Sequence, residues 1–259
     1  MNKGAMALAQ AMFEEYWPCW QHRFSPEVRL RLGGIPLAAV SGCTSDTAGH
    51  YLNADELAQW AGFHLEKRRA EWLGGRIAAK WSAAGLLGEP AMDWRKMMIR
   101  TEEDGRPHVA TAAHPVAPFI SISHSGPMAG ALAANLPCGL DIQEPGDRIQ
   151  RVRERFAAPE EEDILAASLP RFFPETERLT MLWAAKEAVR KTVRLTPLLG
   201  LQEIRLLAGH GGCGTPQDPL ALHFASGRDQ EDCPAFISVL CFFADNLAWA
   251  MACSPAQKE

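Results

Sequence analysis

Three short runs between residues 119 and 142 provide the first indication of the fold: FISIS at 119–123, MAGALAA at 128–134 and CGLDI at 138–142. In the first run Phe119, Ser121 and Ser123 share one face of a strand, and the two isoleucines between them occupy the other face. The second and third runs are separated only by Asn-Leu-Pro, so we expect them to pair as a β-hairpin.

A long helix is predicted upstream of these strands, over residues 65–87, where apolar and basic positions recur at helical spacing. Its Gly74-Gly75 pair weakens the helix locally without ending it. We expect a shorter helix to begin at Asn53, because Asn is a favoured N-cap and Glu56 stands three residues later as its capping-box partner.

Local patterns predict elements elsewhere in both halves of the chain. These are strands at 28–32 and 35–40 separated by a turn at Gly33-Gly34, a turn at 102–107, helices at 149–156, 159–167 and 175–194, and strands at 235–243 and 247–252. The order strand, long helix, strands therefore occurs twice, without a recognisable repeat of residues. We expect an α/β (α+β) fold of two similar lobes, 1–135 and 136–259, with a single larger α+β domain as the alternative that the pattern leaves open.

Composition is ordinary for a globular protein of 259 residues, with 47% hydrophobic and 22% charged residues. Lys and Arg number 26 against 31 Asp and Glu, so the formal net charge is −5, which argues against a general nucleic-acid binder. No apolar run in the sequence reaches the ~18 residues of a membrane span. Glu14 and Glu15 interrupt the N-terminal apolar segment before a signal-peptide core develops. We therefore expect neither nucleic-acid nor membrane partners.

Seven cysteines, an odd number, form no C-x-x-C pair; they are at positions 19, 43, 138, 213, 233, 241 and 253. Neither a disulfide framework nor a zinc site fits this spacing. Cys138 and Cys241 stand in apolar strand-like runs, where a cysteine acts as a small buried hydrophobe. A reducing, cytoplasmic compartment is the expected location.

Two strand segments carry side chains suited to phosphate or metal chemistry. SISHSG at 121–126 ends a strand with hydroxyls and an imidazole, which bind phosphate oxygens well, although a strand-end turn capped by its serines is the ordinary alternative. GLDIQE at 139–144 places Asp141 on the strand face opposite its apolar neighbours. Strands disfavour a carboxylate unless something compensates it, such as Mg²⁺, or unless it is an exposed strand-end acid.

A third segment, WAAKEAVRK at 183–191, places Glu187 and Lys191 four residues apart on the helix face of Trp183. As a structural pair they contribute only ~0.2–0.5 kcal/mol, whereas functionally the carboxylate would hold a metal while the lysine meets a phosphate. Other chemistries lack their motifs. His124 has no G-x-S-x-G segment near it, no H-E-x-x-H is present, and the glycine-rich segment 209–214 lacks the Lys-Ser/Thr of a phosphate loop.

Taken in order, four motifs resemble those of the two-lobed, Sfp-type 4′-phosphopantetheinyl transferases. They are GRP at 105–107, FISISHSG at 119–126, GLDIQ at 139–143 and WAAKEAVRK at 183–191. The stretch RRAEWLGGRIAAK at 68–80 is similar to the family's basic helix in the N-terminal lobe, so the resemblance covers roughly residues 65–195. It implies two similar lobes related by a pseudo-two-fold axis, with coenzyme A bound between them. It also implies transfer of the 4′-phosphopantetheine arm to a serine of an apo acyl, peptidyl or aryl carrier protein, with release of 3′,5′-ADP.

The resemblance also implies a role for individual residues. The catalytic set is Asp141, Glu187 and Lys191: the two acids would ligate Mg²⁺, Glu187 would act as general base for the carrier serine, and Lys191 would neutralise charge on the phosphates. Breaking a pyrophosphate needs such neutralisation and in-line positioning more than covalent chemistry. The residues implied in binding coenzyme A are Arg106, Pro107, Ser123, His124, Lys191 and, on the basic helix of the N-terminal lobe, Arg69 and Arg76.

One position departs from the family pattern, since the second acid of the strand motif, commonly Glu, is Gln143 here. An amide oxygen ligates Mg²⁺ but supplies no charge, so we keep Gln143 in the expected metal set and expect looser metal binding, or a water-filled site. Glu144 alternates to the other face of the strand and is a poor substitute. Mn²⁺ often replaces Mg²⁺ at oxygen sites, so the sequence does not fix the metal.

Gln143 also supports a rival function, a non-catalytic coenzyme A- or carrier-binding protein on the same fold. Retention of the acids Asp141 and Glu187 together with Lys191 argues against it, because binding alone does not need a metal acid and a base. An unrelated phosphate-binding α/β enzyme would require the ordered motifs to be coincidental.

A basic stripe suggests where a carrier protein would dock. Arg148, Arg151 and Arg155 fall at i, i+3 and i+7, on one face of the expected helix at 149–156. Carrier proteins are typically acidic and would be steered to it, with a solvated helix face as the alternative. The apolar stretch 169–173 would line a carrier groove or simply pack. We expect the protein to act as a monomer.

Overall fold

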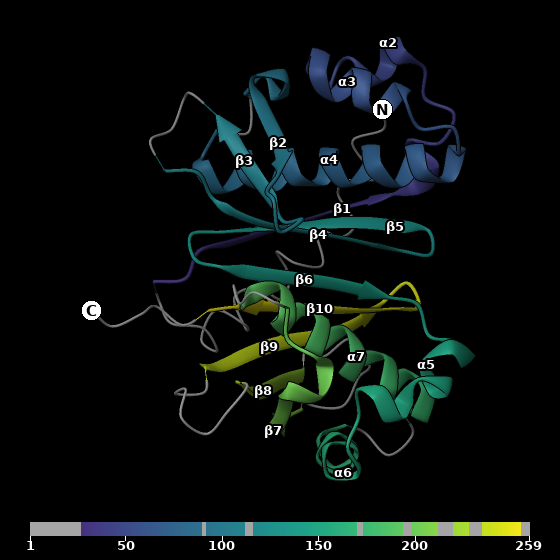
Figure 1. The fold of residues 1–259 in the computed structure, drawn as a ribbon, viewed down its shortest axis with the longest axis vertical. Helices are drawn as coiled ribbons and strands as arrows, with labels where there is room; N and C mark the ends of the chain where they lie inside the picture. Colours follow the sequence, from purple (N-terminus) through teal and green to yellow (C-terminus); the bar gives the residue numbers. More distant parts are fainter. Residues whose placement is uncertain are drawn as a thin grey trace. The chain divides into compact units, whose positions relative to one another are not determined.

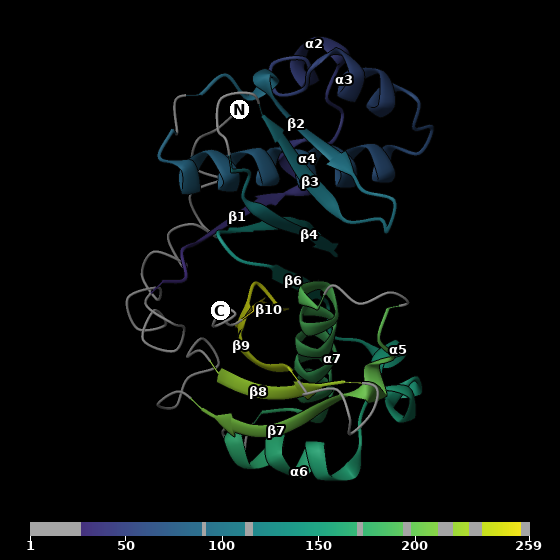
Figure 2. The same cartoon turned by 60° about the vertical axis from the view of Figure 1, so that its left-hand side comes forward.

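The computed structural model describes residues 27–89, 92–111, 116–169, 173–193, 198–211, 220–227 and 235–254. The chain divides into two compact units, one containing Arg29–Asn135 (unit 1) and the other containing Leu136–Glu259 (unit 2). Each unit is a five-stranded antiparallel sheet with a long helix on one face (Figure 1, Figure 2). None of the described helices is both long and apolar enough to cross a membrane.

The described residues of unit 1 form five strands and three α-helices. In chain order they are β1 (Leu30–Pro36), α2 (Ser45–Ala48), α3 (Ala54–Ala61), α4 (Glu66–Leu87), β2 (Met97–Thr101), β3 (Pro107–Thr111), β4 (Phe119–Ser125) and β5 (Met128–Ala134), with short 3-10 turns η1 (Leu37–Ala39) and η2 (Trp94–Lys96). The sheet order is β1-β5-β4-β3-β2, and α4 packs against β1, β5 and β4. The core of the unit lies at this contact and includes Ile35, Leu73 and Ile77.

Unit 2 repeats this topology. Its elements are β6 (Cys138–Gln143), α5 (Asp147–Arg151), η3 (Arg153–Arg155), α6 (Pro159–Ser168), α7 (Glu175–Thr192), η4 (Leu201–Glu203), β7 (Ile204–His210), β8 (Leu220–Ser226), β9 (Ala235–Ala244) and β10 (Leu247–Cys253). The sheet order is β6-β10-β9-β8-β7, and α7 packs against β6, β10 and β9. In both units, therefore, the first strand lies at one edge and pairs with the last.

Several predicted elements are confirmed by the structure. Asn53 caps α3 in a capping box with Glu56, and α4 runs unbroken through the Gly74-Gly75 pair. The diglycine lets the helix approach the sheet, because a Cβ at Gly74 would lie 3.1 Å from Leu37 Cδ2 and 3.2 Å from Ala129 Cβ. Strands at β4, β9 and β10, helices at α6 and α7, and the turn before β3 also appear, each within a few residues of its expected bounds.

The turn predicted at Gly33-Gly34 is wrong, since β1 continues through both glycines. Helix α4 explains the glycine: a Cβ at Gly33 would lie 2.6 Å from Ser82 Oγ and 2.7 Å from Trp81 Cε3. The glycine therefore serves close packing of helix on strand and not a change of chain direction.

The hairpin predicted across Asn-Leu-Pro is also wrong. β5 lies between β1 and β4 in unit 1, whereas β6 pairs with β10 in unit 2. Asn135 ends one ladder, where its Oδ1 accepts from Arg29 N at 2.7 Å, and Pro137 begins the other, where its carbonyl accepts from Ser254 N at 2.8 Å. The short connection therefore links the two units, because each strand finds its partner in its own sheet.

The helix predicted at 149–156 is replaced by the five-residue α5 and the 3-10 turn η3, joined at Val152. β2, β3, β7 and β8 were not predicted from the sequence. Cys138, Cys241 and Cys253 are buried, as expected of small hydrophobes for the first two. Cysteines 19, 213 and 233 lie outside the described residues.

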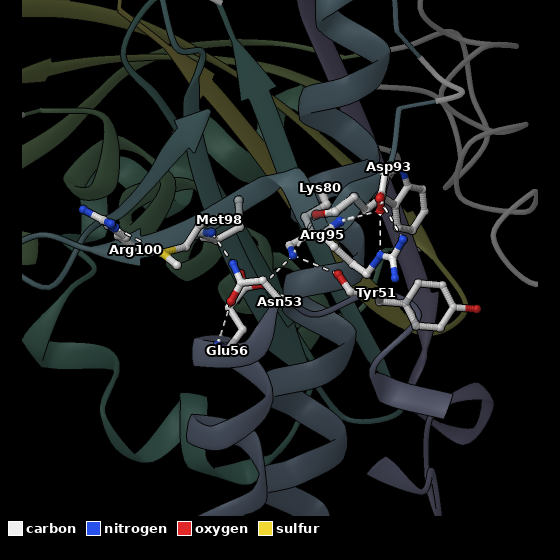
Figure 3. A network of polar contacts seen from close by, with 10 residues as sticks. Tyr51, Asn53, Glu56, Lys80, Asp93, Arg95, Met98 and Arg100 are labelled. Carbon is white, nitrogen blue, oxygen red and sulfur yellow. Dashed lines mark hydrogen bonds and ion pairs between the residues drawn. The ribbon is translucent and has the colours of Figure 1, made fainter. Parts of the chain in front are cut away.

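A buried ion pair joins the helices of unit 1. Lys80 of α4 is fully buried and donates to Glu56 of α3, to Tyr51 O at 2.8 Å and to Trp94 O at 3.0 Å (Figure 3). Three acceptors therefore meet the three donors of the ammonium group. The other oxygen of Glu56 accepts from the backbone N of Ile99, which fixes β2 to the same pair.

Unit 2 contains the same network. Lys186 of α7, 1% exposed, donates to Glu161 of α6 at 2.7 Å, to Phe156 O at 2.5 Å and to Leu201 O at 3.2 Å. Glu161 Oε1 accepts from Leu206 N on β7 at 2.7 Å.

The networks reveal a repeat of residues that the sequence analysis did not recognise. Both lysines end an Ala-Ala-Lys triplet, at 78–80 and 184–186, and both glutamates stand at the third position of a helix and accept the N–H of its N-cap residue.

Candidate active site

Gly139 brings β6 close enough to α7 for their side chains to meet. A Cβ at this position would lie 1.9 Å from Ala188 O and 2.7 Å from Thr192 Oγ1, so only glycine fits. Two residues later Asp141 points to the same face of the strand, and its Oδ1 accepts from Lys191 Nζ at 2.7 Å. Lys191 also donates to Leu140 O at 2.8 Å, which ties the lysine to the backbone of the strand.

Glu187 stands one helical turn before Lys191 and is 9% exposed. Its Oε2 accepts from Arg190 Nη2 at 2.7 Å. Burial raises the pKa of the Glu187 carboxyl above its ordinary value of 4.5, Arg190 opposes the shift, and the negative charge of Asp141 adds to it. Two buried carboxylates, from a strand and from the helix packed on it, therefore influence each other in one site.

These carboxylates fit a hard divalent cation. Mg²⁺ prefers oxygen ligands and is usually held by one or two carboxylates, with substrate phosphates and water completing its shell. Among the described residues no group of three or more His, Cys, Asp or Glu side chains gathers as a metal cluster. Gln143 lies two residues beyond Asp141 on β6, where its Nε2 donates to Glu144 O at 3.2 Å.

Two charged residues of α7 were given no role by the sequence analysis. Lys186, next to Glu187 in the chain, is turned away into the network with Glu161 and supports the helix. Arg190 contacts the candidate base directly, and its i+3 spacing from Glu187 is the signal that would have indicated it.

The residues expected to bind the coenzyme A nucleotide lie in unit 1. Arg76 is 8% exposed, its guanidinium lies 4.5 Å from the ring centroid of Trp72, and burial lowers its pKa. Arg69 lies 4.1 Å from the ring centroid of Trp60. Within the described part of the chain, the buried Nε atoms of both arginines have no hydrogen-bond partner. Buried unsatisfied donors are uncommon, and a ligand with acceptor oxygens is one group that would satisfy them.

The remaining nucleotide candidates lie on β3, β4 and the turn before β3. Arg106 Nε is 3.2 Å from Asp104 Oδ2, and Pro107 begins β3. Ser123 is buried on β4, and the neighbouring His124 is exposed, with Nδ1 3.7 Å from Glu71 Oε1. Strand β4 thus includes His124 and ends at Ser125, before the turn at Gly126.

The proposed carrier-binding stripe has a different geometry from that expected. Arg148, Arg151 and Arg155 are exposed, but the break between α5 and η3 removes the common helix face. Of the apolar stretch 169–173, residues 170–172 lie outside the described parts of the chain, and Phe173 packs into the core against Phe243.

Comparison with known families identifies most of the second half of the chain. The family model of the 4′-phosphopantetheinyl transferase superfamily matches residues 137–233. This part of the chain is a domain of that superfamily. The matched segment contains Asp141, Glu187 and Lys191, so the two carboxylates and the lysine described above all lie within the superfamily domain. No curated protein matches the sequence.

Solved structures similar to the chain include two holo-(acyl-carrier-protein) synthases. The enzyme of Bacillus anthracis str. Ames, in complex with CoA (3′,5′-ADP), is 22% identical over 40% of this chain and 92% of its own, with a TM-score of 0.37. The enzyme of Neisseria meningitidis is 18% identical over 40% of this chain and 94% of its own, with a TM-score of 0.36.

Proposed function

We propose that this protein is a two-lobed, Sfp-type 4′-phosphopantetheinyl transferase, which moves the 4′-phosphopantetheine arm of coenzyme A to a serine of an apo carrier protein. The observation that carries the proposal is the cluster of Asp141, Glu187 and Lys191 on β6 and α7, within a domain of that superfamily. A protein that only bound coenzyme A would not need two buried carboxylates beside a lysine.

In this reaction the serine oxygen forms a bond to the phosphorus that carries pantetheine, and the P–O bond of the pyrophosphate breaks. The electron pair of that bond leaves with 3′,5′-ADP. Glu187 accepts the serine proton, a role for which its raised pKa suits it, because a carboxylate with a higher pKa is a stronger base. Lys191 neutralises negative charge on the phosphates as the bond breaks.

Asp141 and Glu187 would hold the metal, with the amide oxygen of Gln143 as a third, uncharged ligand. A bound Mg²⁺ would supply positive charge against the pyrophosphate. The pair of carboxylates fits this ion better than a soft metal, because all the donors are oxygens.

The nucleotide of coenzyme A is assigned to unit 1. Arg76 and Arg69 carry buried guanidinium donors that phosphate oxygens would satisfy. Arg106, Pro107, Ser123 and His124 complete this set, as the family motifs imply. We further propose that the enzyme is a cytoplasmic monomer and that the exposed side chains of Arg148, Arg151 and Arg155 attract an acidic carrier protein.

Intact-protein mass spectrometry tests the reaction on a panel of apo acyl, peptidyl and aryl carrier domains incubated with the protein, coenzyme A and Mg²⁺. We expect at least one carrier to gain a single phosphopantetheine, and the gain to disappear when its acceptor serine is replaced by alanine. Coenzyme A binding in calorimetry without modification of any carrier would favour the binding-protein alternative, and absence of binding would contradict the family function altogether.

Glu187→Gln tests the role of the base. We expect transfer to fall by at least ~100-fold, the usual contribution of general base catalysis, while the dissociation constant of coenzyme A changes little. Glu177→Gln, which removes a carboxylate from the first turn of the same helix, serves as the matched control and should transfer normally. A fully active Glu187→Gln protein would remove Glu187 from the mechanism.

A further inference from the structure

Each of the two carboxylates in the candidate active site is paired with its own cation. Asp141 is bound by Lys191, and Glu187 by Arg190, with both N–O distances at 2.7 Å. The family motifs assign Lys191 a role at the phosphates, whereas Arg190 has none. Two negative and two positive charges therefore balance in the protein on its own.

The two kinds of residue differ in exposure. The side chains of Asp141 and Glu187 are 10% and 12% exposed, whereas those of Lys191 and Arg190 are each 32% exposed. The carboxylates thus form a buried floor, and the cations form a rim that is open to solvent. A cation in the rim can leave its carboxylate without unpacking the core.

The rim cations are held unequally. Lys191 donates to Asp141 and also to the carbonyl of Leu140, so two bonds fix it to β6. Arg190 makes its bond to Glu187 Oε2, an oxygen that a divalent cation would also require. A metal ion that adds two positive charges to a balanced site repels the nearest cations, and the more weakly held Arg190 is the one expected to yield.

We propose that Arg190 is a positioning residue that holds Glu187 in the metal-free protein and releases it when a divalent cation binds. This inference rests on the proposed function, since it takes Glu187 as a metal ligand. In the metal-free protein Arg190 thereby orients the Glu187 carboxylate and neutralises its charge. Metal binding then competes with this ion pair.

Titration of the coenzyme A-free protein with Mn²⁺, followed by electron paramagnetic resonance, measures this competition without any transfer reaction. We expect Arg190→Gln to bind Mn²⁺ about three- to fivefold more tightly than the wild type, as removal of a partly exposed ion pair would allow. Arg190→Lys keeps the cation and should retain an affinity close to that of the wild type. Arg153→Gln, which removes an arginine paired with Glu162 and Glu175 in the same unit, should leave Mn²⁺ affinity unchanged.

Thermal unfolding supplies a second readout. In the presence of a chelator Arg190→Gln should have a lower Tm than the wild type, because two buried carboxylates then share one cation, and saturating Mn²⁺ should remove the difference. A purely structural arginine would lower Tm equally with and without metal.

Unchanged or weaker Mn²⁺ binding by Arg190→Gln overturns the inference, and so does the same gain in Arg153→Gln or the absence of Mn²⁺ binding by the wild type. These results are separable from the proposed function. A wild-type protein that transfers phosphopantetheine while Arg190→Gln binds Mn²⁺ normally would contradict only the role of Arg190.

Discussion

Lys80 in unit 1 and Lys186 in unit 2 have the same buried surroundings, yet the residues that follow them differ: Trp81 in one and Glu187 in the other. Each lysine is satisfied by one glutamate and two backbone carbonyls, and each glutamate also accepts the N–H of an adjacent strand. The network thus stabilises the frame of both units, and it is present whether or not the next residue is an acid.

The first strands show the same difference. Gly33 and Gly139 each allow a strand to lie close to the long helix of its unit, and two residues later stands Ile35 in β1 but Asp141 in β6. Five residues after the network lysine the helices carry Gly85 in unit 1 and Lys191 in unit 2. The fold thus supplies the same scaffold in both units, and three residue differences on the first strand and the long helix separate a packing face in unit 1 from a candidate active site in unit 2.

Removal of the network lysines gives the largest expected effect. Lys80→Met and Lys186→Met each leave a buried glutamate without its counter-ion, so both should lose about 3–5 kcal/mol of unfolding free energy in urea denaturation. Adding Glu56→Gln or Glu161→Gln to the respective lysine variant should recover part of the loss, because the neutral amide removes the uncompensated charge while its single oxygen still accepts one of the two backbone N–H groups. A marked stability difference between the two lysine variants would break the equivalence of the networks.

Substitution of the close-packed glycines should have a smaller effect that distinguishes the units. Gly139→Ala places a methyl group against the backbone carbonyl of Ala188, whereas Gly33→Ala meets mainly the side chains of Ser82 and Trp81. Both should cost about 1–3 kcal/mol, with Gly139→Ala the more severe because a helix backbone adjusts less than side chains. Gly146→Ala, with nothing within 4 Å of the new methyl group, is the control for the urea measurements. Equal losses would show that β6 and α7 are no more tightly packed than β1 and α4.

The smallest expected effect concerns Glu187, which takes the place in unit 2 that Trp81 has in unit 1. Since burial raises the folded-state pKa of Glu187, the stability that this group provides is present below pH 4.5 and lost as the pH rises through the folded-state pKa. Glu187→Gln should therefore have a higher Tm than the wild type at pH 7, and the gap should narrow as the pH falls towards 4.5. Glu177→Gln should show no such rise in calorimetry, and a lower Tm for Glu187→Gln at pH 7 would contradict the direction of the shift.

Elements with strong local signals were predictable from the sequence. The Asn53–Glu56 capping box and the helical periodicity of 65–87 depend on neighbours within a few residues, and both gave the right helices. The Gly33-Gly34 pair led to a wrong turn prediction, because two adjacent glycines occur both in turns and where a strand packs closely against a helix. The partners of β5 and β6 were missed because sheet order depends on strands about 100 residues apart.

In the candidate site, the sequence indicated the residue types but not their partners. Asp141 and Lys191 are 50 residues apart, and their contact follows only from the packing of β6 on α7. The sequence motif does not distinguish Lys186 from Lys191. Burial does: Lys186 is buried in the structural network, whereas Lys191 is partly exposed in the candidate site. Arg190 was overlooked because an i+3 pair on a helix is common and weak.

The pairing of the first strand with the last has a kinetic consequence. In each unit the opening strand has no neighbour in its sheet until the closing strand has been synthesised, so β1 waits for β5 and β6 waits for β10. Such long-range pairing slows folding, because the chain between the two strands loses conformational entropy before their contacts form and compensate for that loss. During translation unit 1 can complete its sheet once Ala134 is made, whereas Asp141 on β6 lacks its neighbouring strand until Cys253 has emerged. The carboxylate of the strand is thus among the first residues of its unit to be made and among the last to be fixed in place.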